Sequence, residues 1–95
     1  MLENNAGITN LLSFTVKSLR LDAVTGDMFG LSRTKSAEII KLGAVLLNGS
    51  VCLKPDAPVT EGSVITVRGK GNGRITEIGG KSRKDRIFIK AERFE

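Results

Sequence analysis

The residues with the most obvious chemical potential lie in the run GKGNGRITEIGGKSRKDR, residues 69–86, which concentrates five glycines and six cations. Glycine-rich loops with a lysine can bind nucleotide phosphates through backbone amides. A P-loop ending in this GGKS would need a glycine at position 75, which is Ile75, and a helix after Ser82, where the pattern predicts a turn and a strand. A dinucleotide fingerprint starting at Gly69 would need a glycine where Arg74 stands. The run therefore predicts strand connections rather than a nucleotide loop.

Catalytic and metal-binding groups are scarce. The chain has no histidine, which is the most common general acid or base and a frequent zinc ligand. Its single cysteine, Cys52, has no histidine partner and follows a predicted hairpin turn, so we expect a sheet cysteine rather than a nucleophile. The sequence predicts a protein that is not an enzyme and that carries no metal or other cofactor.

The net positive charge of the chain lies entirely in its last third. Residues 1–67 contain six cations and six anions, whereas residues 68–95 contain nine cations and four anions. Such an asymmetric charge suits a polyanionic partner, nucleic acid before membrane. The alternative is that these cations only keep a small domain in solution.

The elements that must position these groups begin with an alternating strand, LSFTVK, residues 12–17, after a tail at residues 1–11 that we expect to be flexible. A first helix follows, with Ser18 as a candidate cap and Gly30 as its end. Ser32 then caps a second helix, in which Ala37, Ile40 and Ala44 form an inward stripe and Gly43 ends the helix. The two helices are therefore expected to meet at a tight corner.

The period then changes to that of strands. AVLL and SVCL flank Asn48-Gly49, a strong signal for a type I′ hairpin turn, and SVITVR, RITEI and RIFIKA are predicted strands. The expected fold is α+β: a two-helix corner packed on a small antiparallel sheet of about five strands. Residues 12–95 are expected to form one domain. No apolar run is long enough to cross a membrane and no signal peptide is recognisable, so we expect a cytoplasmic protein.

Ordered motifs across the helix pair resemble a known family. RLD at 20–22, SRTKSAEIIKLG at 32–43, VLLNG at 45–49 and VTEGSVITV at 59–67 resemble the S4-type RNA-binding domain, which has an αL-type fold. When the leading FTVKSLRLD and the basic tail are included, the chain resembles the C-terminal domain of bacterial YlmH-type proteins. In that domain a further hairpin extends the shared core. Members of that family have other domains ahead of this one.

The resemblance, together with the positive end of the second helix, implies a set of RNA-contacting residues. Asp22 is expected to orient the helix corner or to pair with a cation. The basic tail supplies an auxiliary patch beside the helix pair. The predicted contacts are Arg20, Ser32, Arg33, Thr34, Lys35 and Lys41 at the helix pair, and Lys81, Arg83, Lys84 and Arg86 in the tail.

The resemblance implies a non-catalytic module that binds structured RNA through phosphate contacts. The expected RNA is ribosomal RNA or transfer RNA, with the large ribosomal subunit as a candidate partner and ribosome rescue or quality control as a candidate role. We expect a monomer with no preference for DNA. The alternative is the RNA-targeting module of an RNA-modifying enzyme, such as a pseudouridine synthase, whose catalytic domain is absent from this chain.

Overall fold

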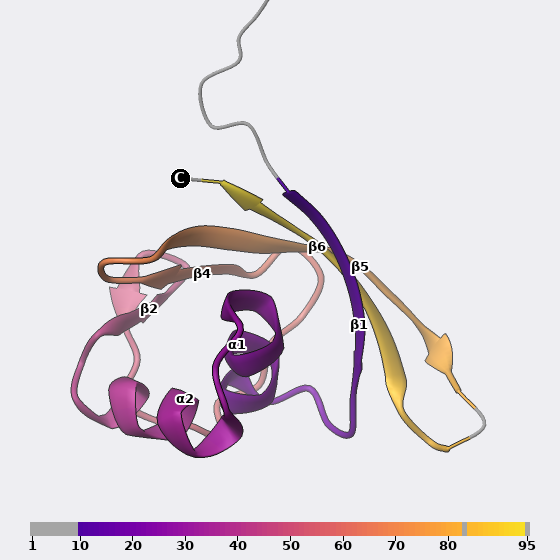
Figure 1. The fold of residues 1–95 in the computed structure, drawn as a ribbon, viewed down its shortest axis with the longest axis horizontal. Coiled ribbons are helices and arrows are strands. Elements are labelled where there is room, and N and C mark those ends of the chain that lie inside the picture. The colour runs from indigo at the N-terminus through magenta and orange to yellow at the C-terminus, as the bar shows by residue number, and fades with distance from the viewer. Residues whose placement is uncertain (1–9, 83, 95) are drawn as a thin grey trace, which may run out of the picture.

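The computed structural model describes residues 10–82 and 84–94 and confirms the α+β fold. Within these residues, two helices and six strands follow one another, and the strands form one antiparallel sheet in the order β1-β6-β5-β4-β2-β3 (Figure 1). The elements are β1 (Asn10–Val16), α1 (Leu21–Phe29), α2 (Arg33–Lys41), β2 (Val45–Leu47), β3 (Ser50–Val51), β4 (Val64–Val67), β5 (Gly71–Lys81) and β6 (Ile87–Phe94).

The first strand begins earlier than the sequence pattern indicates. Asn10 and Leu11 pair with Arg93 and Glu92 of β6, although the pattern places them in the tail. Leu11 is exposed, so its side chain gives no alternation signal, and only the backbone pairing places it in the strand. Residues 1–9 of the predicted flexible tail lie outside the described residues.

The largest departure from the expected strands is the length of β5. The sequence predicts a strand over RITEI, but the strand runs from Gly71 to Lys81 and forms a long hairpin with β6 (Figure 1). Its register against β6 shifts between Ile75 and Glu77 and again between Ile78 and Lys81. Such bulges allow a glycine-rich segment to keep its backbone pairing with the neighbouring strand while the strand bends. Most of the run that first suggested a nucleotide loop is therefore sheet.

The turn residues behave as predicted, but the start of α1 does not. Asn48 and Gly49 have φ of 53° and 86°, and Gly30 ends α1 with φ of 71°. Ser18 does not cap α1, because the helix begins later in the chain, after Arg20. The first amides of α1, on Leu21 and Asp22, instead donate to the carbonyls of Ala57 and Pro55 at 2.8 and 2.9 Å. A loop distant in sequence thus caps this helix.

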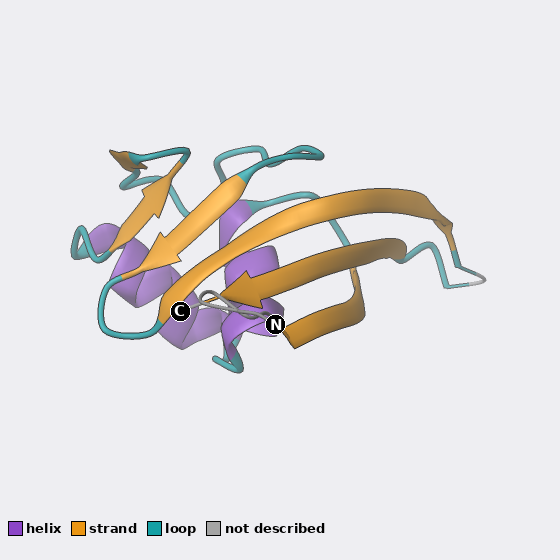
Figure 2. Cartoon of the chain, turned by 90° about the horizontal axis from the view of Figure 1, so that it is seen from above, coloured by secondary structure: helices purple, strands orange, loops and turns teal. Residues whose placement is uncertain are grey.

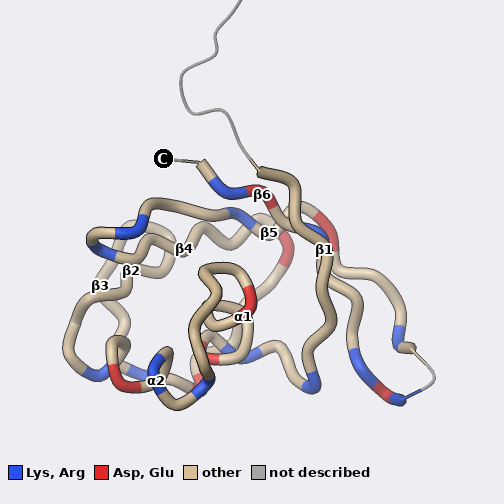
Figure 3. Tube along the Cα trace, viewed as in Figure 1, with Lys and Arg blue, Asp and Glu red and all other residues tan. Residues whose placement is uncertain are grey.

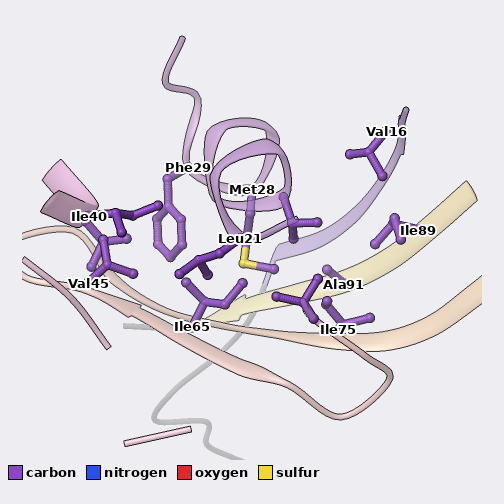
Figure 4. Close-up of a cluster of buried hydrophobic side chains, with 13 residues drawn as sticks. Val16, Leu21, Met28, Phe29, Ile40, Val45, Ile65, Ile75, Ile89 and Ala91 are labelled. Atoms are coloured by element: carbon purple, nitrogen blue, oxygen red, sulfur yellow. The ribbon is translucent and has the colours of Figure 1, made fainter. Parts of the chain in front are cut away.

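The hydrophobic core lies between the helices and one face of the curved sheet (Figures 2 and 4). It extends from Ile40 and Val45 at one end to Val16 and Ile89 at the other (Figure 4). Four apolar residues at helical spacing in α1 are all buried: Leu21, Val24, Met28 and Phe29. No helix in the described part of the chain is long and apolar enough to cross a membrane.

The predicted inward stripe of α2 needs a correction. Ile40 is buried, but Ala37 and Ala44 are only half-buried, and Ser36 is fully buried instead. The Ser36 hydroxyl donates to the backbone carbonyl of Asp22 at 2.8 Å, which satisfies a polar group inside the helix corner. Because α2 buries so little of its surface, most of the helix remains available to a partner.

Candidate nucleic-acid interface

The helix corner is built around the buried carboxylate of Asp22, whose side chain is 4% exposed. Arg20 donates to both carboxylate oxygens, from Nε at 3.1 Å and from Nη2 at 3.0 Å. Nε of Arg33 lies 3.5 Å from Oδ2 of the same group. One carboxylate thus holds two predicted RNA contacts, Arg20 from the start of α1 and Arg33 from the start of α2, as the expected orienting role of Asp22 requires.

The amino end of α2 has the predicted geometry. The Ser32 hydroxyl accepts a hydrogen bond from the Lys35 amide at 3.0 Å, so Ser32 is the helix cap. The amides of Arg33 and Thr34 are the first two of the helix and have no carbonyl one turn earlier within it. Lys35 pairs with Glu38 at 3.1 Å, but both side chains are more than half exposed, and such surface pairs contribute little. The helix end is positive and open.

One face of α2 forms a shallow surface groove, which we call the α2 groove. Arg33, Thr34 and Lys41 line it. Arg33 and Lys41 are eight positions apart, which places them about two helical turns apart on the same face. The remaining lining consists of Asp22, Ala37 and Glu38. Three of the six predicted helix-pair residues therefore line one concave surface, whereas Arg20, Ser32 and Lys35 are not part of its lining.

The predicted auxiliary patch divides into two parts. Lys81 and Lys84 are exposed at the turn end of the β5–β6 hairpin, away from α2 (Figure 1), and Arg83 lies outside the described residues. Arg86 lies where this turn enters β6 and is half-buried. Its Nε donates to the Thr15 hydroxyl at 2.8 Å and its Nη2 to the Thr15 carbonyl at 2.7 Å. Arg86 therefore has a structural role that sequence reasoning did not assign.

Cations nevertheless connect these two regions. In Figure 3, Lys and Arg segments, with a few Asp and Glu segments between them, follow one rim of the molecule from α2, past the end of β1, to the turn end of the β5–β6 hairpin. A pocket in this rim, which we call the corner pocket, has Lys17, Asp27, Arg33 and Arg86 among its lining residues. Lys17 and Asp27 are not among the predicted site residues. Lys17 lies within the matched stretch FTVKSLRLD, but only the fold places it and Asp27 beside the helix corner.

Asp27 is the acidic group of the corner pocket. Partial burial raises the pKa of its carboxyl above the ordinary value of 3.8, and the positive charge of Arg86 opposes that shift. The net direction shows that loss of hydration outweighs the attraction to Arg86. Arg86 therefore does not fully compensate the loss of hydration of this carboxylate.

Several other cations of the tail are engaged within the protein. Arg74 pairs with Glu92 at 3.2 Å, and Nζ of Lys90 lies 3.8 Å from Glu77. The Arg93 guanidinium lies over the Phe29 ring, 4.7 Å from its centroid. These three cations of the last third therefore serve the sheet, whereas Arg68 and Lys70 are exposed between β4 and β5, away from the rim.

Two comparisons with known proteins show what the chain is similar to. A family model described as the S4 domain matches residues 19–65, a segment that includes both helices and the α2 groove. A curated protein of Bacillus subtilis, "Ribosome-associated protein quality control protein P2", is 43% identical over 79 residues, which are 83% of this chain and 31% of that protein. The chain thus spans less than a third of the length of this relative.

Proposed function

The chain contains an S4 domain, and from this premise we propose that it is a non-catalytic module that binds structured RNA, ribosomal or transfer RNA, through the phosphate backbone. The observation that supports this proposal most directly is the α2 groove, which Arg33, Thr34 and Lys41 line from the open amino end of α2 to its last turn. Helix amino ends and basic side chains are common partners of phosphate groups.

The proposed contacts follow from the side chains in place. Arg33, Thr34 and Lys35 would contact a phosphate at the helix end, and Lys41 a phosphate further along the groove. Arg20 would contribute from the other side of Asp22, which already orients its guanidinium. The chain has only four aromatic residues, all phenylalanine, so a surface of stacked bases is not expected. Recognition would depend on the shape and backbone of a folded RNA.

The biological setting is proposed from the relative. Its name describes a ribosome-associated quality control protein, and the sequence identity extends over most of this chain. We extend that setting to this chain as a monomeric, cytoplasmic, ribosome-associated RNA-binding module, with the large subunit as a candidate partner. The same name favours this role over the targeting module of an RNA-modifying enzyme.

Salt titration of RNA binding tests the proposal. Affinity for bulk transfer RNA and for purified large ribosomal subunits would be measured from low to moderate salt. Each neutralised phosphate is expected to contribute roughly 0.7 to 0.9 to the slope of log K against log salt, so several contacts would give a steep loss of affinity. Binding that does not change with salt would overturn the proposed mechanism.

Substitutions in α2 provide the matching test in the protein. The double variant Arg33→Gln, Lys35→Gln should weaken binding by roughly tenfold or more and flatten the slope by one to two contacts. Lys90→Gln is the matched control, because Lys90 is an exposed cation on the sheet face that the helices do not cover. If the folded double variant bound RNA as tightly as the control variant, the α2 groove would not be the RNA site.

A further inference from the structure

We propose that the corner pocket seats one backbone phosphate of the bound RNA between Lys17, Arg33 and Arg86. The inference rests on the proposed function and extends the contact surface from the α2 groove to the turn end of the β5–β6 hairpin. It assigns a binding role to Lys17, and it makes Asp27 a group that opposes binding.

The pocket gathers charge from elements that are distant in sequence. Lys17 follows β1, Arg33 begins α2, and Arg86 precedes β6. The cavity has a volume of about 200 Å³. Because a water molecule occupies roughly 30 Å³ of liquid, the space can admit a phosphate group together with some of its water. Three cations against the single carboxylate of Asp27 give the charged lining an excess of two positive charges.

Arg86 is already held in place for such a contact. Thr15 accepts hydrogen bonds from Nε and Nη2 of its guanidinium, which fixes the plane of the group against β1. A guanidinium has five N–H donors, and these two bonds use two of them. The remaining donors belong to a side chain with little rotational freedom left to lose, so a phosphate would bind to a preorganised group.

The corner pocket and the α2 groove share one residue. Arg33 lines both, so the two surfaces meet at the amino end of α2. The corner itself is tight, because a Cβ on Gly26 would lie 2.9 Å from the Leu31 carbonyl oxygen. An RNA strand that follows the α2 groove would therefore pass the mouth of the corner pocket with its next phosphates. Arg86 would then connect the hairpin extension to the same strand as the S4 core.

Asp27 gives the inference a second expected effect, opposite in sign to that of removing a cation. Its carboxylate would repel a phosphate seated beside Arg86, so the neutral amide of Asp27→Asn should increase affinity. We expect bulk transfer RNA to bind this variant roughly two- to fivefold more tightly. Lys17→Gln should bind it roughly three- to tenfold more weakly, with a salt slope lower by about 0.7 to 0.9.

The experiment compares the 95-residue chain with Lys17→Gln, Asp27→Asn and the control Lys90→Gln, using bulk transfer RNA over a range of salt. Circular dichroism and urea unfolding verify that each variant is folded. Opposite effects of Lys17→Gln and Asp27→Asn, with no effect of Lys90→Gln, would support the corner pocket. If both pocket variants matched Lys90→Gln while Arg33→Gln, Lys35→Gln lost affinity, the corner pocket would be refuted and the proposed function would stand. Salt-insensitive binding by the unmodified chain would refute both.

Discussion

The guanidinium of Arg86 donates from Nε to the hydroxyl of Thr15 at 2.8 Å, joining residues 71 positions apart in the chain. Nη2 of the same guanidinium donates a second hydrogen bond, to the Thr15 carbonyl at 2.7 Å. Together they fasten the turn end of the β5–β6 hairpin to the first strand, which lies at the edge of the sheet. A residue expected only to attract phosphate therefore also stabilises the hairpin extension against the rest of the domain.

Removing one or both of these hydrogen bonds should lower the free energy of unfolding of the domain. Thr15→Val keeps the size and branching of the side chain but deletes the hydroxyl, so we expect unfolding to become easier by about 0.5 to 1.5 kcal/mol. Arg86→Gln removes both bonds and leaves two acceptors unpaired, so we expect about 1 to 3 kcal/mol. Urea denaturation measures both values. Equal stability of Arg86→Gln and the unmodified chain would show that the hairpin does not depend on Thr15.

The buried carboxylate of Asp22 should matter more for stability than an ordinary surface charge. In Asp22→Asn a neutral amide replaces the carboxylate that accepts two hydrogen bonds from the Arg20 guanidinium. The amide NH₂ group can only donate, so it cannot accept either of these bonds. We expect a loss of about 1.5 to 3 kcal/mol, the range for hydrogen bonds that involve charged groups. Asp56→Asn, in the exposed loop before β4, is the control and should change unfolding by less than about 0.5 kcal/mol. Comparable small losses in both variants would argue against the orienting role of Asp22.

Gly26 should be intolerant of even one methyl group. Alanine is the better helix former, but its Cβ would lie 2.9 Å from the Leu31 carbonyl oxygen, which is backbone and cannot rotate away. We expect Gly26→Ala to destabilise the domain by about 1 to 3 kcal/mol through a shift of the corner. Gly80→Ala is the control, because a Cβ at that position would meet nothing within 4 Å. A stabilised Gly26→Ala variant would mean that the corner is looser than its geometry indicates.

The features that sequence reasoning predicted correctly are encoded by residues close together in the chain. The Ser32 cap, the end of α1 at Gly30 and the turn at Asn48-Gly49 each depend on a few neighbouring residues. The S4 motifs then place the helix pair on a sheet. The α2 groove could be anticipated because Arg33 and Lys41 lie on one short helix.

The features that it missed depend on contacts between distant segments. The loop at residues 55–57 caps α1, so no local cap is needed at Ser18. Bulges extend β5 through glycines that resemble a loop when taken alone. Nothing in the local sequence around Lys17 or Asp27 assigns either residue to a site, and only the fold places them in the corner pocket. A local pattern cannot contain this information.

The pH dependence of stability should reveal Asp27 without any RNA. Partial burial raises the pKa of its carboxyl in the folded state above 3.8, with Arg86 opposing the shift. Below 3.8 the carboxyl is protonated in both folded and unfolded chains, and as the pH rises through the folded-state pKa, its ionisation disfavours the fold. Asp27→Asn cannot ionise. It should therefore be more stable than the unmodified chain near neutral pH, and this advantage should diminish as the pH falls.

Urea unfolding of both chains from about pH 7 down to about pH 3 measures this difference. Asp56→Asn controls for the loss of one negative charge, because it makes the same change in an exposed loop. An advantage of Asp27→Asn that persists or grows toward acid pH would contradict the direction of the pKa shift. An advantage confined to neutral pH would show that Asp27 is held at a cost in stability, in a pocket whose other charged residues are cations.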